Sequence, residues 1–459
     1  MTSAGTERPY LLGNGHVLTA TAKPVVIDDG AVVWQGEHIV AVGPEGELRS
    51  RFPDAVFLDA RGGLIRPGFV NLHHHFYSAL ARGLDPGAEM KDFSQVLDRL
   101  WWRLDRALDA ETVRLSAQLC AADCVRWGNT TVFDHHASPS VVAGSLDLIA
   151  GAMEEAGLSA VLCYEVTDRN GHDEALAGIE ENLRFLEARR DDPRIRGIFG
   201  LHASFTLRDE TLKEVARRRS DVAGCHIHLA EDPVDVAATR EVFGVGPVER
   251  LERFGLLDER ALLAHGIHLD DEAYTTIAGH GSTVIHNPES NNNNGVGRLD
   301  TVRTGALGCR VGLGTDGMSS AVQRALRSAF LTHRGATRDP MSGFEVLPEL
   351  LETNVEVART FFDEPLLGTL APGAPADVIS IDAPTPTPLT AANAFGHLVY
   401  GASEAPVRHT VARGRVVLED FRHTTVDPGE LAARARGLSP ALWQRFHQLE
   451  WGTPHLGED

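Results

Sequence analysis

The sequence predicts an α/β protein, a (β/α)8 TIM-like barrel with an accessory β-sandwich domain built from both termini. Eight short apolar runs between Phe69 and Thr315 alternate with helix-like segments, which is typical of parallel βα units. Eight is also the number of strands that closes such a barrel. Groups of β-type runs precede and follow this region, and 459 residues with 43% hydrophobic content are enough for both domains.

The elements follow in order along the chain. Strand-like runs such as Val25–Ile27 and His38–Val42 come first, separated by Gly and Asp turns. A helix is expected at about residues 110–127, because Asp109 can cap its start and Gly128 can end it. The eight barrel strands are expected at Phe69–His73, Thr130–Asp134, Ala160–Glu165, Gly197–Leu201, Gly224–His228, Ala261–His265, Thr283–His286 and Val311–Thr315.

The pattern changes again after Leu370, where runs such as Val378–Ile381 can complete the N-terminal sheet. The last stretch of the chain is expected to be mostly helical. We therefore predict a composite β-sandwich from residues 1–65 and 370–427, a barrel from residues 66–369 and a C-terminal helical extension from residues 428–459.

Charge and cysteine usage limit the kind of protein. Asp and Glu outnumber Lys and Arg by 64 to 43, and the net charge of −21 argues against nucleic acid or an anionic membrane as a partner. Five scattered cysteines without paired spacing predict neither disulfides nor a thiolate metal site. No run is long enough for a membrane helix, and the segment Met1–Arg8 lacks the features of a signal peptide. We therefore expect a cytoplasmic protein.

Histidines at the end of the first predicted strand are candidate metal ligands. Side chains alternate along a strand, so His73 and His75 project to the same side and both can reach one cation. His74 points the other way and is expected to be structural.

The run Cys225–Glu231 repeats this pattern and adds a carboxylate just past a strand. His228 is the better ligand, because it lies nearer the carboxyl end where barrel sites assemble, and His226 is expected behind it. Glu231 is placed to take a proton from water and return it to a leaving group, as a Glu that is not a ligand does in zinc deaminases.

Three further residues end predicted strands. Asp316 offers a hard oxygen ligand, although an Asp here can also cap a helix. His265 and His202 can orient water or polarise a substrate atom, and a purely hydrogen-bonded role for each stays open. Three His and one Asp suit Zn²⁺, with Fe²⁺ also possible. We expect one metal ion, because residues 195–205 contain no Lys that could bridge a second one.

The signatures occur in a recognisable order at Pro67–His75, His228–Glu231, Leu263–Gly266, His286–Asn291 and Gly314–Gly317. On these motifs the chain resembles the amidohydrolase superfamily, in its deaminase and chlorohydrolase branch. The resemblance implies proton shuttling by Glu231 and orientation of water or substrate by His265 and His202. It also implies a homo-oligomer, and metal binding by His73, His75, His228 and Asp316.

A narrower resemblance is to SsnA-type aminohydrolases. That group often has Met at the position of Asn292. The matching segments are Trp101–Leu108, Asp134–Pro139, Thr167–Asn170 and Ser290–Asn294.

The substrate is expected to be a small heterocycle held by loop residues beyond the strand ends. Of these, Arg82 and His136 are the preferred candidates; the others are Tyr77, Trp102, His135 and Asn287. We predict a metal-dependent aminohydrolase that removes ammonia from an amino-substituted N-heterocycle such as a purine or pterin. Three alternatives stay open, namely displacement of halide or another group from a triazine-like ring, opening of a cyclic amide, and a non-catalytic barrel.

Overall fold

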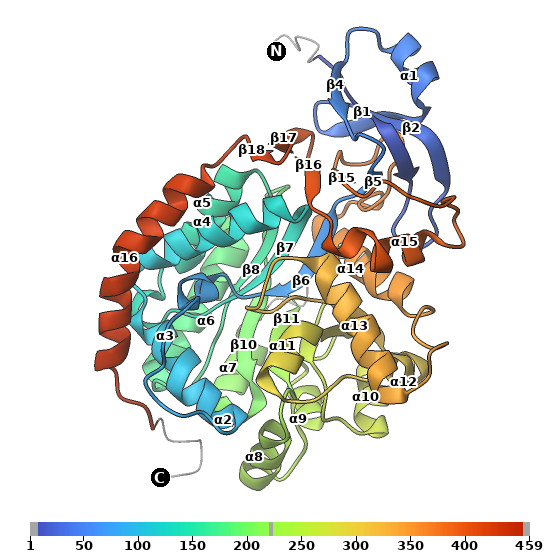
Figure 1. The fold of residues 1–459 in the computed structure, drawn as a ribbon. Coiled ribbons are helices and arrows are strands. Elements are labelled where there is room, and N and C mark those ends of the chain that lie inside the picture. Colours follow the sequence, from blue (N-terminus) through green and yellow to red (C-terminus); the bar gives the residue numbers. More distant parts are fainter. Residues whose placement is uncertain (1–7, 220–223, 453–459) are drawn as a thin grey trace.

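Strands from both ends of the chain form a sheet domain beside a barrel of parallel strands in the computed structural model, which describes residues 8–219 and 224–452 (Figure 1). The segment Met1–Arg8, apart from its last residue, and the end of the predicted C-terminal helical extension lie outside these described residues. None of the described helices combines the length and the apolar character needed to cross a membrane.

All eight predicted barrel strands are present, as two parallel groups of three and five strands. A single parallel bridge, Val166 to Leu201, joins the two groups on one side. Their ends lie within two residues of the predicted ends, and the predicted strand Thr283–His286 matches at both ends. A short extra strand, β9 (Ile195–Gly197), pairs with β8 before the fourth barrel strand begins. The barrel strands are β6 (Phe69–His74), β7 (Asn129–His136), β8 (Ser159–Tyr164), β10 (Phe199–Ala203), β11 (Cys225–Leu229), β12 (Leu262–His265), β13 (Thr283–His286) and β14 (Arg310–Leu313).

The ring closes where β6 meets β14. A single parallel bridge joins His74 to Asp316, and the backbone N–H of Asp316 donates to the carbonyl of His73. The Asn354 side chain, buried behind this junction, donates to the carbonyls of Val70 and Leu313 and accepts from the N–H of Leu313. Hydrogen bonds of the Asn354 side-chain amide therefore replace part of the regular backbone hydrogen bonding between the two strands at this junction.

Helices surround the barrel and cover the outer faces of its strands (Figure 1). The predicted helix after Asp109 is confirmed as α4 (Ala110–Arg126), where Asp109 and Thr112 form a capping box. The others are α5 (Ser145–Ala156), α6 (His172–Ala188), α7 (Asp209–Arg218), α8 (Pro233–Phe243), α9 (Pro247–Arg253), α10 (Asp271–Gly279), α11 (Pro288–Asn294), α12 (Thr301–Ala306), α13 (Val322–Thr337) and α14 (Leu347–Phe362).

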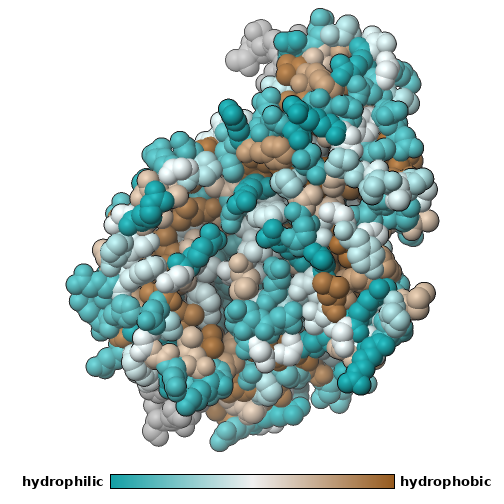
Figure 2. All heavy atoms as spheres, in the orientation of Figure 1, coloured by the Kyte–Doolittle hydropathy of each residue, from teal (hydrophilic) through white to brown (hydrophobic). Residues whose placement is uncertain are grey.

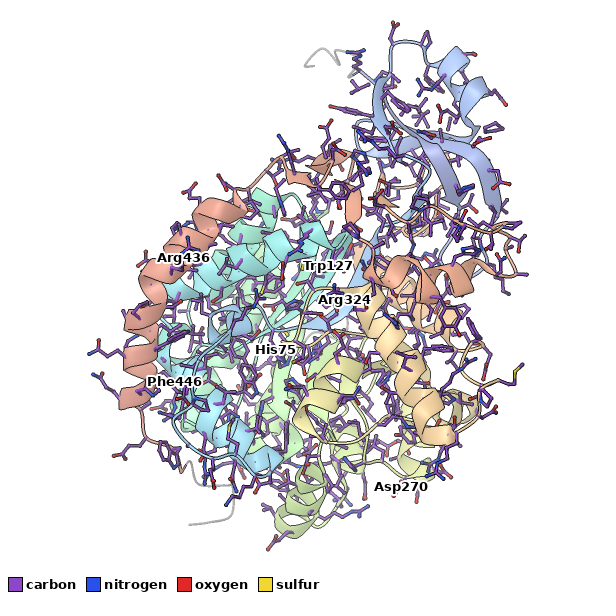
Figure 3. The ribbon with its side chains drawn as sticks, in the orientation of Figure 1. His75, Trp127, Asp270, Arg324, Arg436 and Phe446 are labelled. Carbon is purple, nitrogen blue, oxygen red and sulfur yellow. The ribbon has the colours of Figure 1, made fainter. Side chains whose placement is uncertain are left out.

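The long connection between β6 and α4 folds into short helical pieces. These are the 3-10 helix Phe76–Ala81, α2 (Phe93–Val96), a π-helical turn at Leu97–Trp101 and α3 (Trp102–Ala107). The C-terminal helix α16 (Pro428–Gln448) packs along α4 and α3, and Arg103 on α3 donates to the carbonyl of Phe446. Phe446 is labelled on this helix in Figure 3.

The accessory domain joins strands from both termini, as predicted, and hydrogen bonds link all of them into one sheet. β5 pairs with β15, which connects the two segments of chain. The division into exact residue ranges stays a prediction. The elements are β1 (Tyr10–Leu18), β2 (Val26–Gln35), β3 (His38–Pro44), α1 (Glu45–Arg51), β4 (Val56–Asp59), β5 (Leu64–Pro67), β15 (Val378–Ile381), α15 (Ala394–Tyr400), β16 (Val407–Ala412), β17 (Arg415–Glu419) and β18 (Arg422–His423).

The face shown in Figure 2 is mostly hydrophilic, with hydrophobic residues in scattered groups. Such a surface agrees with the acidic composition.

Candidate active site

The four predicted metal ligands meet at the carboxyl ends of the barrel strands, and His75 lies inside the barrel in Figure 3. The Nε2 atom of His75 is 3.0 Å from Nε2 of His228 and 3.1 Å from Oδ1 of Asp316. His73 Nε2 is 3.6 Å from the same Asp316 oxygen. These side chains come from β6, β11 and the end of β14, so the closed barrel is what brings them together.

Hydrogen bonds behind the ligands fix which ring nitrogen faces the centre. Nδ1 of His75 donates to the carbonyl of His135 at 2.6 Å, and Nδ1 of His228 donates to the carbonyl of His202 at 3.0 Å. The Nε2 lone pairs of both rings therefore point toward each other. His73 Nε2 is buried without a hydrogen-bond partner among the described residues, and its Nδ1 lies 2.9 Å from His226. Converging lone pairs on buried rings fit a divalent cation.

The charges of the cluster also fit a cation. Burial alone would lower the pKa of His75, but the neighbouring Asp316 carboxylate outweighs it and raises this pKa to about 9. Burial tends to raise the pKa of Asp316, yet its hydrogen bond with His75 holds that pKa well below its usual value. Both shifts arise from the same pair, in which a proton on His75 balances the buried Asp316 carboxylate, and a bound cation would take the place of that proton. The donor set of three imidazoles and one carboxylate suits zinc.

Glu231 lies beside this cluster. Its Oε2 is 3.4 Å from Nε2 of His265, and Nδ1 of His265 donates to Oδ1 of Asn291 at 2.8 Å. Burial raises the pKa of Glu231 to about 7, and the charge of Asp316 adds to the rise. A carboxyl group with such a pKa can both accept and donate a proton near neutral pH.

The backbone at the site adopts an unusual conformation. Ala230, His265 and Asp316 all have positive φ angles, of 46°, 74° and 54°. A left-handed backbone at a residue other than Gly is strained, and such strain often occurs where a side chain must be aimed at a functional position.

The short helix α11 holds three of these groups. Ser290 donates to Oδ2 of Asp316 at 2.6 Å, Asn291 accepts from His265, and Asn294 donates to Glu231 at 3.4 Å. These roles were missed at the level of sequence, although the motif at His286–Asn291 had been singled out. The helical spacing of the three residues is the signal that could have found them.

A cavity of about 870 Å³, counted with its opening to solvent, leads to the cluster. Such a volume suits a small organic substrate. Aromatic residues of the first loop form one wall, and six carboxylates face the space, without Lys or Arg among the described lining residues. The lining includes Phe93, Trp101, Trp102, Asp105, Glu165, His202, Phe205, Glu231, Asp232, Asp235, Asn294, Asp316 and Met318.

Of the residues predicted to bind the substrate, some line the cavity and others do not. His202 lines the cavity, and its Nδ1 lies 2.6 Å from Oγ1 of Thr206. His136 is buried against Ser138 and does not line the cavity. Arg82 is misplaced by the prediction, because its side chain is 82% exposed and lies near Asp123 at the surface, where its charge stays solvated.

The remaining loop candidates also divide. Tyr77 and Trp102 line the cavity. His135 and Asn287 are buried beside it without lining it.

Comparison with known proteins agrees with this geometry. Residues 64–417 match the model described as the amidohydrolase family. The chain belongs to the amidohydrolase family. Residues 30–55 also match an imidazolonepropionase-like composite domain of bacteria.

Relatives of this amidohydrolase are similar to it over nearly its whole length. A 5-methylthioadenosine/S-adenosylhomocysteine deaminase from Pelotomaculum thermopropionicum is 30% identical, over 93% of this chain and 97% of the relative. A 5'-deoxyadenosine deaminase from Methanosarcina mazei is 28% identical, over 95% and 99%. Membership of this family makes the protein a metal-dependent hydrolase that acts on carbon–nitrogen bonds other than peptide bonds.

Solved structures share the fold. An adenosine deaminase from Xanthomonas campestris with bound zinc has a TM-score of 0.82 and 24% identity, over 96% of this chain and 99% of that one. An atrazine chlorohydrolase from Arthrobacter aurescens complexed with zinc has a TM-score of 0.76 and 22% identity, over 94% and 100%. At these identities the likeness is one of fold.

One buried network of the amidohydrolase was not anticipated. Arg169 Nη2 lies 3.0 Å from Oδ2 of Asp105 and 3.3 Å from Oε1 of Glu165. Burial alone would raise the pKa of Glu165, but its imidazole and guanidinium neighbours outweigh it and hold that pKa well below its usual value. Asp105 and Arg169 lie in the matching segments Trp101–Leu108 and Thr167–Asn170, but nothing in those segments predicts that they meet Glu165 at the end of β8.

Proposed function

We propose that this amidohydrolase is a hydrolytic deaminase that removes ammonia from an amino-substituted N-heterocycle of the purine type. The observation that carries the proposal is Glu231, with a pKa of about 7, next to His265 and to the cluster of His73, His75, His228 and Asp316. The two relatives, a 5-methylthioadenosine/S-adenosylhomocysteine deaminase and a 5'-deoxyadenosine deaminase, support the reaction type.

One zinc ion is proposed in the cluster, held by His73, His75, His228 and Asp316. A divalent ion bound there would lower the pKa of water toward neutrality. A single ion is favoured because His75 and His228 each have one ring nitrogen free, and both nitrogens face the same centre.

The protein groups divide the proton transfers between them. Glu231 takes a proton from the attacking water and delivers it to the departing nitrogen. His265, fixed by Asn291, turns its Nε2 toward Glu231 and orients the water. Asp316 helps to orient the attacking oxygen, and His202 contacts the substrate ring from the cavity wall.

The finer parts of the prediction remain proposals. They are the closer relation to SsnA-type aminohydrolases, the assembly into a homo-oligomer and the cytoplasmic location.

The test is to measure ammonia release from aminopurines, their nucleosides and pterins, with wild type beside Glu231→Gln. We expect release from at least one of these compounds and a loss of about 10²–10⁴-fold in kcat in the variant, because Gln keeps the size but cannot exchange a proton. Glu241→Gln, an exposed change on α8, is the matched control.

Metal content and melting temperature are measured on each variant. A variant that keeps its metal and near-wild-type turnover would remove Glu231 from the proposed role. Halide release from a chlorotriazine, or a new carboxylate from a cyclic amide, with no ammonia from any amine, would contradict deamination.

A further inference from the structure

A second acidic group lies close to the metal cluster and is not used in the proposed proton transfers. An oxygen of Glu165 lies within 4.8 Å of a ring nitrogen of His75 and of a ring nitrogen of His228. Glu165 also lines the cavity, with 4% of its side chain exposed. If a substrate ring is held over the metal cluster, the edge of the ring that carries the reacting carbon therefore lies next to Glu165.

A second metal ion is not the best occupant of this place. The free nitrogens of His75 and His228 already face the first centre, since the other nitrogen of each ring donates to a backbone carbonyl. His135 keeps only Nδ1, which lies 3.2 Å from Oε2 of Glu165, because its Nε2 lies 3.0 Å and 3.1 Å from two carbonyls. Glu165 is left with too few unshared ligands for a second closed site.

The neighbouring histidine offers another acceptor. The hydroxyl of Thr206 donates to the carbonyl of Ala203 at 3.0 Å, so the close contact between its oxygen and Nδ1 of His202 places the proton on Nδ1. Nε2 of His202 then carries a lone pair. It lies 3.7 Å from Oε1 of Glu165, which makes two hydrogen-bond acceptors side by side on the cavity wall.

The rest of the network keeps this wall rich in acceptors. One guanidinium, Arg169, serves two carboxylates, and Oδ1 of Asp105 has no hydrogen-bond partner among the described residues. Arg169 also lies 4.7 Å from the ring of Trp102, which lines the cavity and offers a flat apolar surface. A planar ligand on this surface meets acceptors along the edge that faces the metal cluster.

We propose that Glu165 and His202 form a recognition edge for a substrate whose ring nitrogen beside the reacting carbon carries a hydrogen, as in an amino-substituted lactam. This inference rests on the proposed deaminase function and narrows its substrate class. In adenine the six-membered-ring nitrogen beside the amine-bearing carbon presents a lone pair, which meets repulsion here, whereas a lactam N–H at that place donates to the carboxylate.

The first experiment compares ligands on wild-type protein with its metal. Guanine, 1-methylguanine and 2-aminopurine carry the same amine, but only guanine has the N–H beside the reacting carbon. We expect kcat/KM for ammonia release to be about 10- to 150-fold higher for guanine, the range of one charge-assisted hydrogen bond. Binding of hypoxanthine and purine, neither of which carries an amine, is measured by calorimetry and should show the same preference for the lactam.

The second experiment tests the residue itself. In Glu165→Gln the side-chain amide can donate to a ring nitrogen, so the preference for guanine over 2-aminopurine should fall by at least about tenfold. Metal content should stay at the wild-type level. Glu187→Gln, exposed on α6, is the matched control and should keep the wild-type preference.

The outcomes separate the two proposals. Equal turnover of the three amines by wild type, or equal binding of hypoxanthine and purine, would overturn the recognition edge while leaving deamination intact. If none of the amines releases ammonia, the proposed deaminase function is wrong. The binding of hypoxanthine and purine, measured by calorimetry, would still test the recognition edge. If Glu165→Gln does not fold, the comparisons on wild-type protein carry the test.

Discussion

His228 shows how a single side chain can be assigned a role from its hydrogen bonds. Its Nδ1 donates to the carbonyl of His202, and its Nε2 lies 3.0 Å from Nε2 of His75, so Nε2 is the nitrogen that is left to face a cation. We propose a ring with this arrangement as a ligand, whose loss removes one of the four proposed donors.

We therefore expect His228→Ala to be purified with much less metal than wild type, because an imidazole leaves the coordinating set. Elemental analysis checks this. His280→Ala, at a half-exposed histidine next to Glu252, is the control and should keep full metal content. A folded His228→Ala protein with wild-type metal content would move the assignment to another residue, with His226 next in line.

Single residues were predicted well where strand geometry decided them. The alternation of side chains correctly placed His73 and His75 together and turned His74 away, toward Ser320. Arg82 could not be placed in the same way, because it follows an irregular 3-10 segment whose direction no periodic pattern reveals. Glu165 was missed for another reason, since its role depends on neighbours from three other segments of the chain.

At the scale of elements, the connection from β11 to α8 carries Glu231 and is held in place by a buried side chain of α8. Asp235, in the first turn of α8, accepts hydrogen bonds from the backbone N–H of Ala230 at 2.7 Å and of Phe205 at 3.2 Å. One buried carboxyl group thus connects the loop that carries Glu231 to the loop after β10.

This tie predicts a stability that depends on pH. Burial raises the pKa of Asp235 to about 6 from 3.8, so the folded protein holds this proton more tightly than the unfolded chain does. Its contribution to stability is complete below about pH 4 and is lost as the pH rises through about 6. The loss amounts to about 3 kcal/mol, at 1.36 kcal/mol for each pKa unit.

Asp235→Asn should be less stable than wild type at pH 5 by about 1–3 kcal/mol, because one of the two N–H groups loses its acceptor. The difference should shrink by pH 8, where wild type has lost its own contribution. Urea unfolding at both pH values measures it, with Glu241→Gln on the same helix as the control. A difference that stays constant with pH would mean that Asp235 does not titrate in this range.

Elements with a clear period and clear ends were predicted almost to the residue. α4 is the best case, since Asp109 caps it and an apolar face runs along it. The short pieces between β6 and α4 were not predicted, because each is only one or two turns long and is held by contacts with α16 rather than by its own sequence.

For the molecule as a whole, the metal cluster connects parts that are far apart in the chain. The proposed donors come from the first and fifth barrel strands and from the residues just after the last one. We expect removal of the metal with a chelator to lower the melting temperature, because a ligand that binds only the folded state stabilises it by about 2.7 kcal/mol at 100 times its Kd. Calorimetry before and after chelation measures the change.

Adding zinc back should restore the melting temperature. Hydrogen exchange should show the largest loss of protection in β6 and β14, the two strands joined by a single bridge. An unchanged melting temperature after complete removal of the metal would contradict this coupling.

The junction of β6 and β14 also has a consequence for how the protein is made. During synthesis the histidines of β6 leave the ribosome long before Asp316 does, and until β14 arrives the ring is an open sheet with two free edges. Open edges invite pairing with other chains. A chain that stops short of Asp316 is therefore expected to form aggregates instead of a smaller working enzyme, and the burden on cellular chaperones should fall once the eighth strand is complete.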